Sequence, residues 1–381
     1  HPLWQIYFVP QYEGGCAVIG RFHHCIGDGL AMLYVLQMLS DDPPSALTGV
    51  PAATPPSAAN DKTSWGWRML KRFVPPLVAF TRTVEASLVS ALRAVIAHPA
   101  SARDAMRDAM RGLALGAGTV WKIAFMRSDP RTVFKGPPSG EKRAVWARPI
   151  PIDTLKAIAR QTGSTINDVI LAAVAGGLRR YLIACDKCDK CDKKVVDHEL
   201  RALVPVNLRP VEEASELGNH FGLLFVPLPL RIDDPLERLF AVRNTTQQIK
   251  RSPERRLTFL LLKVLGIMPS PLFEMVVNLF GRRCTVMTTN VVGPREPLRM
   301  AGTTLKQVLF WIPCSGHLGT GISMCSYFGN LWLGIATDGR LVPDPEVIIA
   351  GVEAEMATLA ERASQGVRHE WLETRTAGRC D

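Results

Sequence analysis

The chain lacks any uninterrupted run of about 18 apolar residues, the length that a helix needs to cross a bilayer. Its most apolar stretch, residues 257–280, is broken by a lysine, two prolines and a glutamate. No charged segment followed by an apolar one precedes the first strand-like residues, so we see no signal peptide. Because the first residue is His1 rather than Met, the chain is either processed or a fragment, and we favour a fragment. From the interrupted apolar runs we expect no spanning helix.

Cysteine is scarce, with nine residues, an odd number, in a chain of 381. Most cysteines lie singly in apolar surroundings, which favours free thiols in a reducing cytoplasmic setting. The exception is a threefold Cys-Asp-Lys repeat at residues 185–193, which has the spacing of zinc ligands. A fourth ligand is absent from the repeat, so we interpret it as a solvated loop and expect no metal site.

Positive charge is uneven along the chain, whose net charge is +10. Residues 62–148 contain 16 Lys and Arg against 5 Asp and Glu, and elsewhere the two signs nearly balance. This segment has no recognised nucleic-acid module and its aromatic residues follow helical spacing, so we expect no nucleic-acid partner. A cationic amphipathic surface fits anionic lipid headgroups; the alternative is a solvated crossover between domains.

The N-terminal part predicts two strands, residues 4–9 and 16–22, joined by a turn at residues 13–15. A helix over residues 30–39 is apolar nearly all round, which predicts burial. The Pro-, Ala- and Ser-rich residues 43–60 have the composition of a linker. Two or three cationic helices are expected over residues 62–128.

The C-terminal part predicts strands and helices without regular alternation. Asp153 is expected to cap one helix and Gly163 to end it, while Gly329-Asn330 is expected to form a hairpin turn. The predicted strands are 143–150, 200–206, 222–230, 285–292, 305–313, 318–327 and 331–337, and the predicted helices are 153–160, 166–183, 235–251, 257–280 and 345–364. This pattern favours mixed α/β layers rather than a doubly wound sheet.

One motif carries chemistry: the run His23-His24-Cys25-Ile26-Gly27-Asp28-Gly29 follows a predicted strand. Neutral imidazole is the side chain best suited to general-base work near pH 7, and an Asp four residues later can hold the turn. Acyl transfer from a thioester to an alcohol needs one base, so a single histidine can serve without an acyl-enzyme. The alternative is a pair of structural histidines beside a turn.

These residues resemble those of the bacterial wax ester synthase/acyl-CoA:diacylglycerol acyltransferases, which belong to the chloramphenicol-acetyltransferase-like superfamily. The similarity continues in Pro2-Leu3-Trp4, Asn167-Asp168 and Asn290-Val291-Val292-Gly293-Pro294, where Val292 departs from the family's proline, and in the strand Gly321–Tyr327. It therefore covers nearly the whole chain. The family has roughly a hundred more residues before the Pro-Leu-Trp motif, about half a domain.

The resemblance implies two chloramphenicol-acetyltransferase-like α/β domains with a channel between them, the N-terminal one incomplete. We expect remnants of that domain at residues 1–60, a basic helical crossover at 61–140 and the C-terminal domain at 141–381. His24 is then the base, and Asp28 is structural and pairs with Arg209. His23 is expected to pack or to support His24.

Four further residues are candidates for substrate binding: Asn167, Asp168, Asn290 and Ser323. For Asn167-Asp168 the alternative is capping of a helix after Thr165. Ser323 is a candidate oxyanion donor because the superfamily often uses a hydroxyl there, and the alternative is a strand serine bonded to the backbone.

The sequence thus predicts an acyl-CoA-dependent O-acyltransferase that makes wax esters, triacylglycerol or both. Its partners would be acyl-CoA, a long-chain alcohol or diacylglycerol, and an anionic membrane or lipid-inclusion surface, with no cofactor. It would be cytoplasmic and peripheral to membranes or inclusions. The alternatives are a condensation-type enzyme that uses a carrier-protein thioester and a non-catalytic lipid-surface protein.

Overall fold

The computed structural model describes residues 2–41, 126–185, 199–208, 219, 221–251, 270–312 and 316–365. By its internal contacts the chain divides into two units. The first comprises residues 1–52, 127–259 and 274–381 and carries the candidate site. Nearly all of the second lies outside the described residues, as do the linker and the cationic helices that the sequence predicts.

The first strands form a two-stranded antiparallel sheet, β1 (Trp4–Tyr12) and β2 (Gly15–Phe22), as predicted. Tyr12 pairs with Gly15, which leaves Glu13-Gly14 as the turn. Side chains on both faces are exposed, including Trp4 and Phe8 at 54% and 64%. Because hairpins with two exposed faces have little stability of their own, this one depends on packing at its ends.

Helix α1 (Gly29–Met38) follows the histidine motif and is less buried than its composition predicts. Only Ala31 and Gln37 are fully buried, and Met38 is 56% exposed. Leu36 packs against a small cluster of Leu298, Tyr327 and Trp332. The expectation of a fully buried helix is therefore wrong, because one face of α1 lacks a neighbour among the described residues.

A seven-stranded mixed sheet forms the centre of the first unit. Its main order is β3-β11-β10-β7-β5-β6, with β4 beside β11; β7 runs parallel to both β10 and β5, and the other pairs are antiparallel. This confirms mixed α/β layers rather than a doubly wound sheet. The strands are β3 (Lys142–Trp146), β4 (Ile150–Pro151), β5 (Leu200–Asn207), β6 (Phe221–Leu228), β7 (Val286–Val292), β10 (Thr320–Tyr327) and β11 (Asn330–Asp338).

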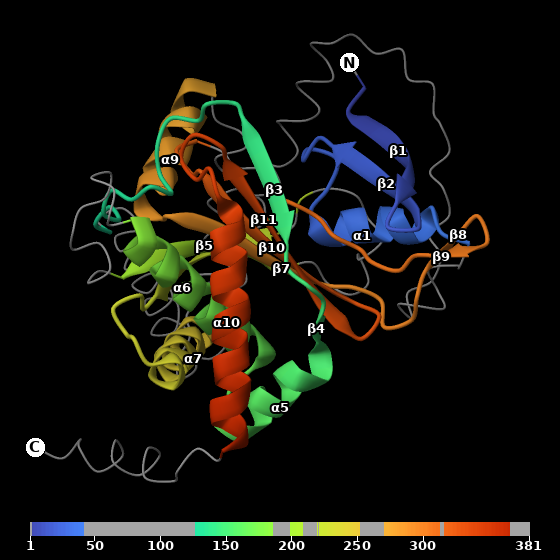
Figure 1. Cartoon of the computed structure of the whole chain (residues 1–381). Coiled ribbons are helices and arrows are strands. Elements are labelled where there is room, and N and C mark those ends of the chain that lie inside the picture. The colour runs from blue at the N-terminus through green and yellow to red at the C-terminus, as the bar shows by residue number, and fades with distance from the viewer. Residues whose placement is uncertain are drawn as a thin grey trace, which may run out of the picture. The chain divides into compact units, whose positions relative to one another are not determined.

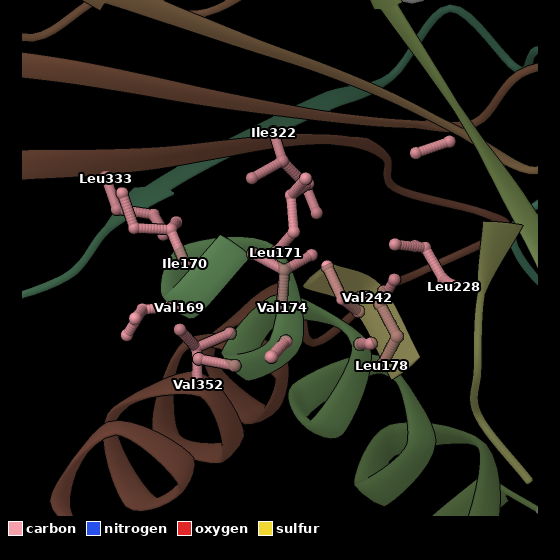
Figure 2. Close-up of a cluster of buried hydrophobic side chains, with 14 of the residues drawn as sticks. Val169, Ile170, Leu171, Val174, Leu178, Leu228, Val242, Ile322, Leu333 and Val352 are labelled. Carbon is pink, nitrogen blue, oxygen red and sulfur yellow. The ribbon is translucent and has the colours of Figure 1, made fainter. Parts of the chain in front are cut away.

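Figure 1 shows α6 and α10 packed beside the sheet, and α5 and α7 pack against these two helices. These helices are α5 (Ile152–Thr162), α6 (Ile166–Cys185), α7 (Pro235–Arg251) and α10 (Pro345–Ser364). Helix α6 is buried along most of its length because it lies between the sheet and α10. In Figure 2 its side chains Ile170 and Leu171 meet Leu333 and Ile322 of the sheet, and Val352 of α10 closes the core from below.

Three predictions about elements need correction. Helix α5 begins at Ile152 without a side-chain cap, and Asp153 lies in its first turn, where its carboxylate pairs with Lys156. The described part of the predicted helix 257–280 is α9 (Ser270–Arg283), which runs further than expected. The predicted hairpin turn is one residue earlier, at Phe328-Gly329, because Tyr327 pairs with Asn330.

The predicted strand at residues 305–313 is wrong, since residues 305–312 have no regular structure. Side-chain hydrogen bonds tie this segment to the neighbouring strands instead. Trp311 donates from Nε1 to the Val145 carbonyl at 3.3 Å, and Ser323 donates to the Phe310 carbonyl. A second small sheet, β8 (Arg299–Met300) with β9 (Thr303–Thr304), lies just before this segment.

Candidate active site

The histidine pair lies where β2 ends, as the sequence predicts. The His23 amide donates to the Leu3 carbonyl at 2.7 Å, which closes the end of the hairpin. The Ile26 amide then donates to the His23 carbonyl at 3.0 Å, and the Cys25 amide donates to His23 Nδ1 at 3.3 Å. His23 therefore shapes the turn, and both imidazoles are exposed.

Asn219 and Phe221, which lie about 200 residues further along the chain, hold His24. Asn219 donates from Nδ2 to the His24 carbonyl at 3.1 Å. The His24 ring meets the Phe221 ring edge to face, with centroids 6.3 Å apart. Since Phe221 is the first residue of β6 and pairs with Asn207 at the end of β5, the histidine lies at the edge where β5 ends.

Asp28 lies buried at the start of α1. It is 7% exposed and caps α1, with Oδ1 accepting from the Ala31 amide at 3.0 Å. An added Cβ on the next residue, Gly29, would lie 2.8 Å from a Val291 methyl, so glycine allows the start of α1 to approach β7 closely. The predicted partner Arg209 lies outside the described residues, and the ion pair stays a prediction.

The structure brings together two motifs that are 123 residues apart: Asn290 donates from Nδ2 to Asn167 Oδ1 at 2.5 Å. Asn167 lies in the first turn of α6 and is exposed, and Asn290 lies near the end of β7. Asn290 Oδ1 is buried and has no hydrogen-bond partner among the described residues. A buried acceptor of this kind is costly unless a ligand or water satisfies it.

Asp168 makes the contacts that the capping interpretation expects. The Thr165 amide donates to its Oδ2 at 2.8 Å, and its own amide donates to Thr165 Oγ1 at 3.3 Å. Thr246 of α7 donates to Oδ1 at 2.6 Å. With 1% exposure and both oxygens engaged, this carboxylate fixes the start of α6 and so the position of Asn167.

Ser323 also makes the contacts of the alternative interpretation. It is 1% exposed, and its hydroxyl contacts the carbonyl oxygens of Phe310 and, at 3.2 Å, Gly334. A hydroxyl with one proton that is already bonded to a carbonyl has none left for an oxyanion. In this structure Ser323 therefore fastens the 305–312 segment to β10 and β11.

The described cysteines offer no buried thiolate near the motif. Burial raises the pKa of the Cys325 thiol to about 12, so it stays protonated near neutral pH. Cys25, within the motif, is exposed and reduced. Among the described residues no three His, Cys, Asp or Glu side chains gather as metal ligands; of the Cys-Asp-Lys repeat only Cys185 is described.

Sequence reasoning singled out neither the contact of Phe221 with His24 nor the pairing of Asn290 with Asn167. Both depend on which strand ends share an edge of the sheet. The bond of Asn219 to the His24 carbonyl likewise needed the fold.

The comparisons with known proteins agree with this arrangement. The description "Wax ester synthase/diacylglycerol acyltransferase catalytic domain" matches residues 1–170, and "WS/DGAT C-terminal domain" matches residues 217–360. Fold and motif thus define an acyltransferase with a histidine at the edge of a mixed sheet. The chain belongs to the wax ester synthase/diacylglycerol acyltransferase family.

Individual relatives extend the likeness along the chain. A Mycobacterium tuberculosis protein named "Probable diacylglycerol O-acyltransferase tgs1" is 27% identical over 364 residues, 94% of this chain and 71% of the relative. The wax ester synthase/diacylglycerol acyltransferase from Marinobacter aquaeolei VT8 has the same fold, with a TM-score of 0.58 at 19% identity, over 95% of this chain and 72% of that one.

A more distant likeness joins the fold to a second class of enzymes. The EpoB cyclization-docking bidomain from Sorangium cellulosum matches with a TM-score of 0.51 at 14% identity, over 95% of this chain and 62% of that one. These structures confirm the predicted chloramphenicol-acetyltransferase-like fold. The channel between domains stays a prediction.

Proposed function

We propose that the chain transfers a long-chain acyl group from acyl-CoA to a fatty alcohol or diacylglycerol, with His24 as general base. The observation that carries the proposal is an exposed imidazole whose backbone is fixed by Asn219 and whose ring is flanked by Phe221. Because the base is already fixed in the folded protein, ordering it costs no further entropy when the substrate binds. This favours proton transfer at a defined point. The family membership supports acyl transfer as the reaction.

In the proposed reaction, His24 takes the proton of the acceptor hydroxyl as its oxygen attacks the thioester carbonyl. A C–O bond forms and the carbonyl π electrons move onto oxygen. When the tetrahedral intermediate collapses, the C–S bond breaks and the CoA sulfur leaves with the proton from His24. The products are an ester and CoA, and no acyl-enzyme or cofactor is required.

The other residues support this site in different ways. Asp28 caps α1 and holds the turn that carries His24, while Asp168 fixes the start of α6. Asn167 and Asn290 form a polar pair that can bind substrate amides or carbonyls. We assign Ser323 no oxyanion role, because its hydroxyl is bonded to main-chain carbonyl oxygens.

The test is His24→Ala, assayed by CoA release with a long-chain alcohol and with diacylglycerol. Loss of a general base typically lowers the rate by about 10²- to 10⁴-fold. We expect that loss in kcat at an unchanged melting temperature, because the imidazole is exposed. Cys25→Ala, one residue further along the turn, is the matched control and should retain the wild-type rate.

Two outcomes would contradict the assignment. Turnover by His24→Ala at the wild-type rate would remove the histidine from the mechanism. The wild type could also fail to use free acyl-CoA but act on carrier-bound acyl groups. That result would favour the condensation-type alternative, whose fold the EpoB bidomain shares.

We further propose that the protein binds anionic membrane or lipid-inclusion surfaces peripherally. The basic segment 62–148 supports this, because its charge suits anionic headgroups and the proposed products are lipids. Most of that segment lies outside the described residues. None of the described helices is both long and apolar enough to cross a bilayer.

A further inference from the structure

A groove of about 510 Å³ lies at the corner where α5 ends and α6 begins. Its lining residues come from the last turns of α5, the connecting turn and the start of α6. They are Lys156, Ala159, Arg160, Gly163, Ser164 and Ile166. The groove thus ends one residue before Asn167, which pairs with Asn290.

The groove is cationic. Lys156 and Arg160 are four residues apart on α5, so their side chains leave the same face of the helix. Arg160 is exposed and donates from Nε to the Lys156 carbonyl at 3.3 Å, which leaves the outer guanidinium nitrogens free of that bond. Among the described residues Lys156 pairs with Asp153, with an Nζ–Oδ1 distance of 3.0 Å.

A third cation stands behind the connecting turn. Arg243 of α7 donates from Nη1 to the Thr162 carbonyl at 3.3 Å. Its Nε is buried without a hydrogen-bond partner among the described residues. Gly163 has a φ of +62°, a conformation that favours glycine, and an added Cβ there would lie 3.5 Å from Arg243 Nη1, in ordinary van der Waals contact. The guanidinium therefore lies directly against the turn.

Charge balance at this corner favours an anion. Within the described part of the chain, neither Arg160 nor Arg243 has a carboxylate within ion-pair distance, whereas Arg179, Arg180 and Arg238 each do. Two cations, Lys156 and Arg160, line the groove, and Arg243 lies behind its turn. Among the described residues the one carboxylate paired with any of them is that of Asp153, which is itself 90% exposed. Arginine guanidinium groups are well matched to phosphate oxygens.

The neighbouring amide pair points to what kind of anion binds. Asn290 Oδ1 is a buried acceptor that has no donor among the described residues. Its amide nitrogen bonds to Asn167, the residue that follows Ile166 of the groove. A ligand that carries phosphates at one end and amide N–H groups further along would satisfy both features. Coenzyme A has this order: phosphates, two pantetheine amides, then the sulfur.

We propose that the groove binds the phosphates of the CoA thioester and that the Asn167–Asn290 pair bonds to an amide of its pantetheine arm. This rests on the proposed function, since it names the subsite for that function's donor substrate. The phosphates bind at the α5–α6 corner, and the arm passes Asn167 toward the edge of the sheet where β7 ends and α1 begins.

The test removes the two exposed cations together, in Lys156→Ala/Arg160→Ala. We expect the KM for acyl-CoA to rise about tenfold, equivalent to ~1.4 kcal/mol, with kcat unchanged. The KM for the matching acyl-pantetheine, which lacks the nucleotide phosphates, should be the same in variant and wild type. The control Lys142→Ala/Arg143→Ala removes two exposed charges from β3 and should change neither value.

A binding measurement separates this subsite from catalysis. By calorimetry, CoA and adenosine 3′,5′-bisphosphate should both bind the wild type more tightly than the Lys156/Arg160 variant. An unchanged KM and affinity for CoA would overturn the subsite, as would equal losses for acyl-CoA and acyl-pantetheine. Lost affinity for anionic vesicles with intact CoA binding would also overturn it, in favour of lipid headgroups.

Failure of the proposed function would look different. If the groove variant weakens CoA binding but His24→Ala turns over normally, the subsite stands and the general-base assignment falls. For the amide contact, Asn290→Ala should raise the KM for acyl-CoA and acyl-pantetheine alike, and an effect on acyl-CoA alone would contradict that contact.

Discussion

At the scale of single residues, Asp28 shows how one carboxylate can have a local and a long-range role. Its bond to the Ala31 amide is worth about 1 kcal/mol as a helix cap, and Asn would supply the same cap. The predicted ion pair with Arg209 is a separate contribution, because it needs the negative charge. A buried pair that loses one partner costs about 3–5 kcal/mol.

Asp28→Asn therefore tests the ion pair without removing the cap. We expect it to lower the free energy of unfolding in urea nearly as much as Asp28→Ala. A cycle with Arg209→Gln should show that the two losses are not additive. A loss below about 1 kcal/mol for Asp28→Asn would leave the cap as the only role.

At the scale of elements, a buried ion network joins three helices. Arg238 of α7 donates to Glu355 Oε2 of α10 at 2.6 Å, and Arg180 of α6 donates to Oε1 at 2.7 Å. Arg238 and Glu355 are 1% and 3% exposed at the side chain. We expect Glu355→Gln to destabilise the protein by about 3 kcal/mol or more, since it leaves a buried arginine charge unpaired.

Thermal unfolding checks this prediction, with the exposed pair Arg143–Glu141 as control. Glu141→Gln should cost less than about 1 kcal/mol. Because buried pairs can be replaced by apolar groups, Arg238→Met/Glu355→Met should recover part of the loss. If Glu355→Gln is as mild as Glu141→Gln, the network contributes little to the packing of α6, α7 and α10.

At the scale of the whole molecule, the separation of charge along the chain predicts salt-sensitive lipid binding. The basic segment should carry the protein up with anionic vesicles in a flotation gradient at low ionic strength. At about 1 M salt the screening length falls to roughly 3 Å and flotation should be lost. Equal flotation with neutral vesicles at high salt would show that charge does not drive the association.

The sequence predicted most elements correctly, and its errors have physical causes. Residues 305–312 are apolar enough for a strand, but their side chains pack on the sheet without backbone pairing, which periodicity cannot distinguish. The apolar pattern of α1 predicted burial because composition does not reveal whether a neighbour is there. Helix α5 lacks the cap expected from Asp153, because the helix begins at Ile152 and Asp153 therefore lies inside its first turn.

The sequence alone determined the family and the mixed α/β fold, because these depend on motif order and local patterns of turn and strand. It also supplied His24 as the candidate base, which stays a prediction. It left open what Asn167, Asp168 and Ser323 do, since capping and binding use the same residue types. Only the tertiary structure decided those contacts. In the folded chain Asp168 and Ser323 are bonded to neighbouring protein groups, and Asn167 is bonded to Asn290. Lys156, Arg160 and Arg243 lie around one turn. Side chains that are distant in sequence meet in this way only when sheet edges and helix ends are packed.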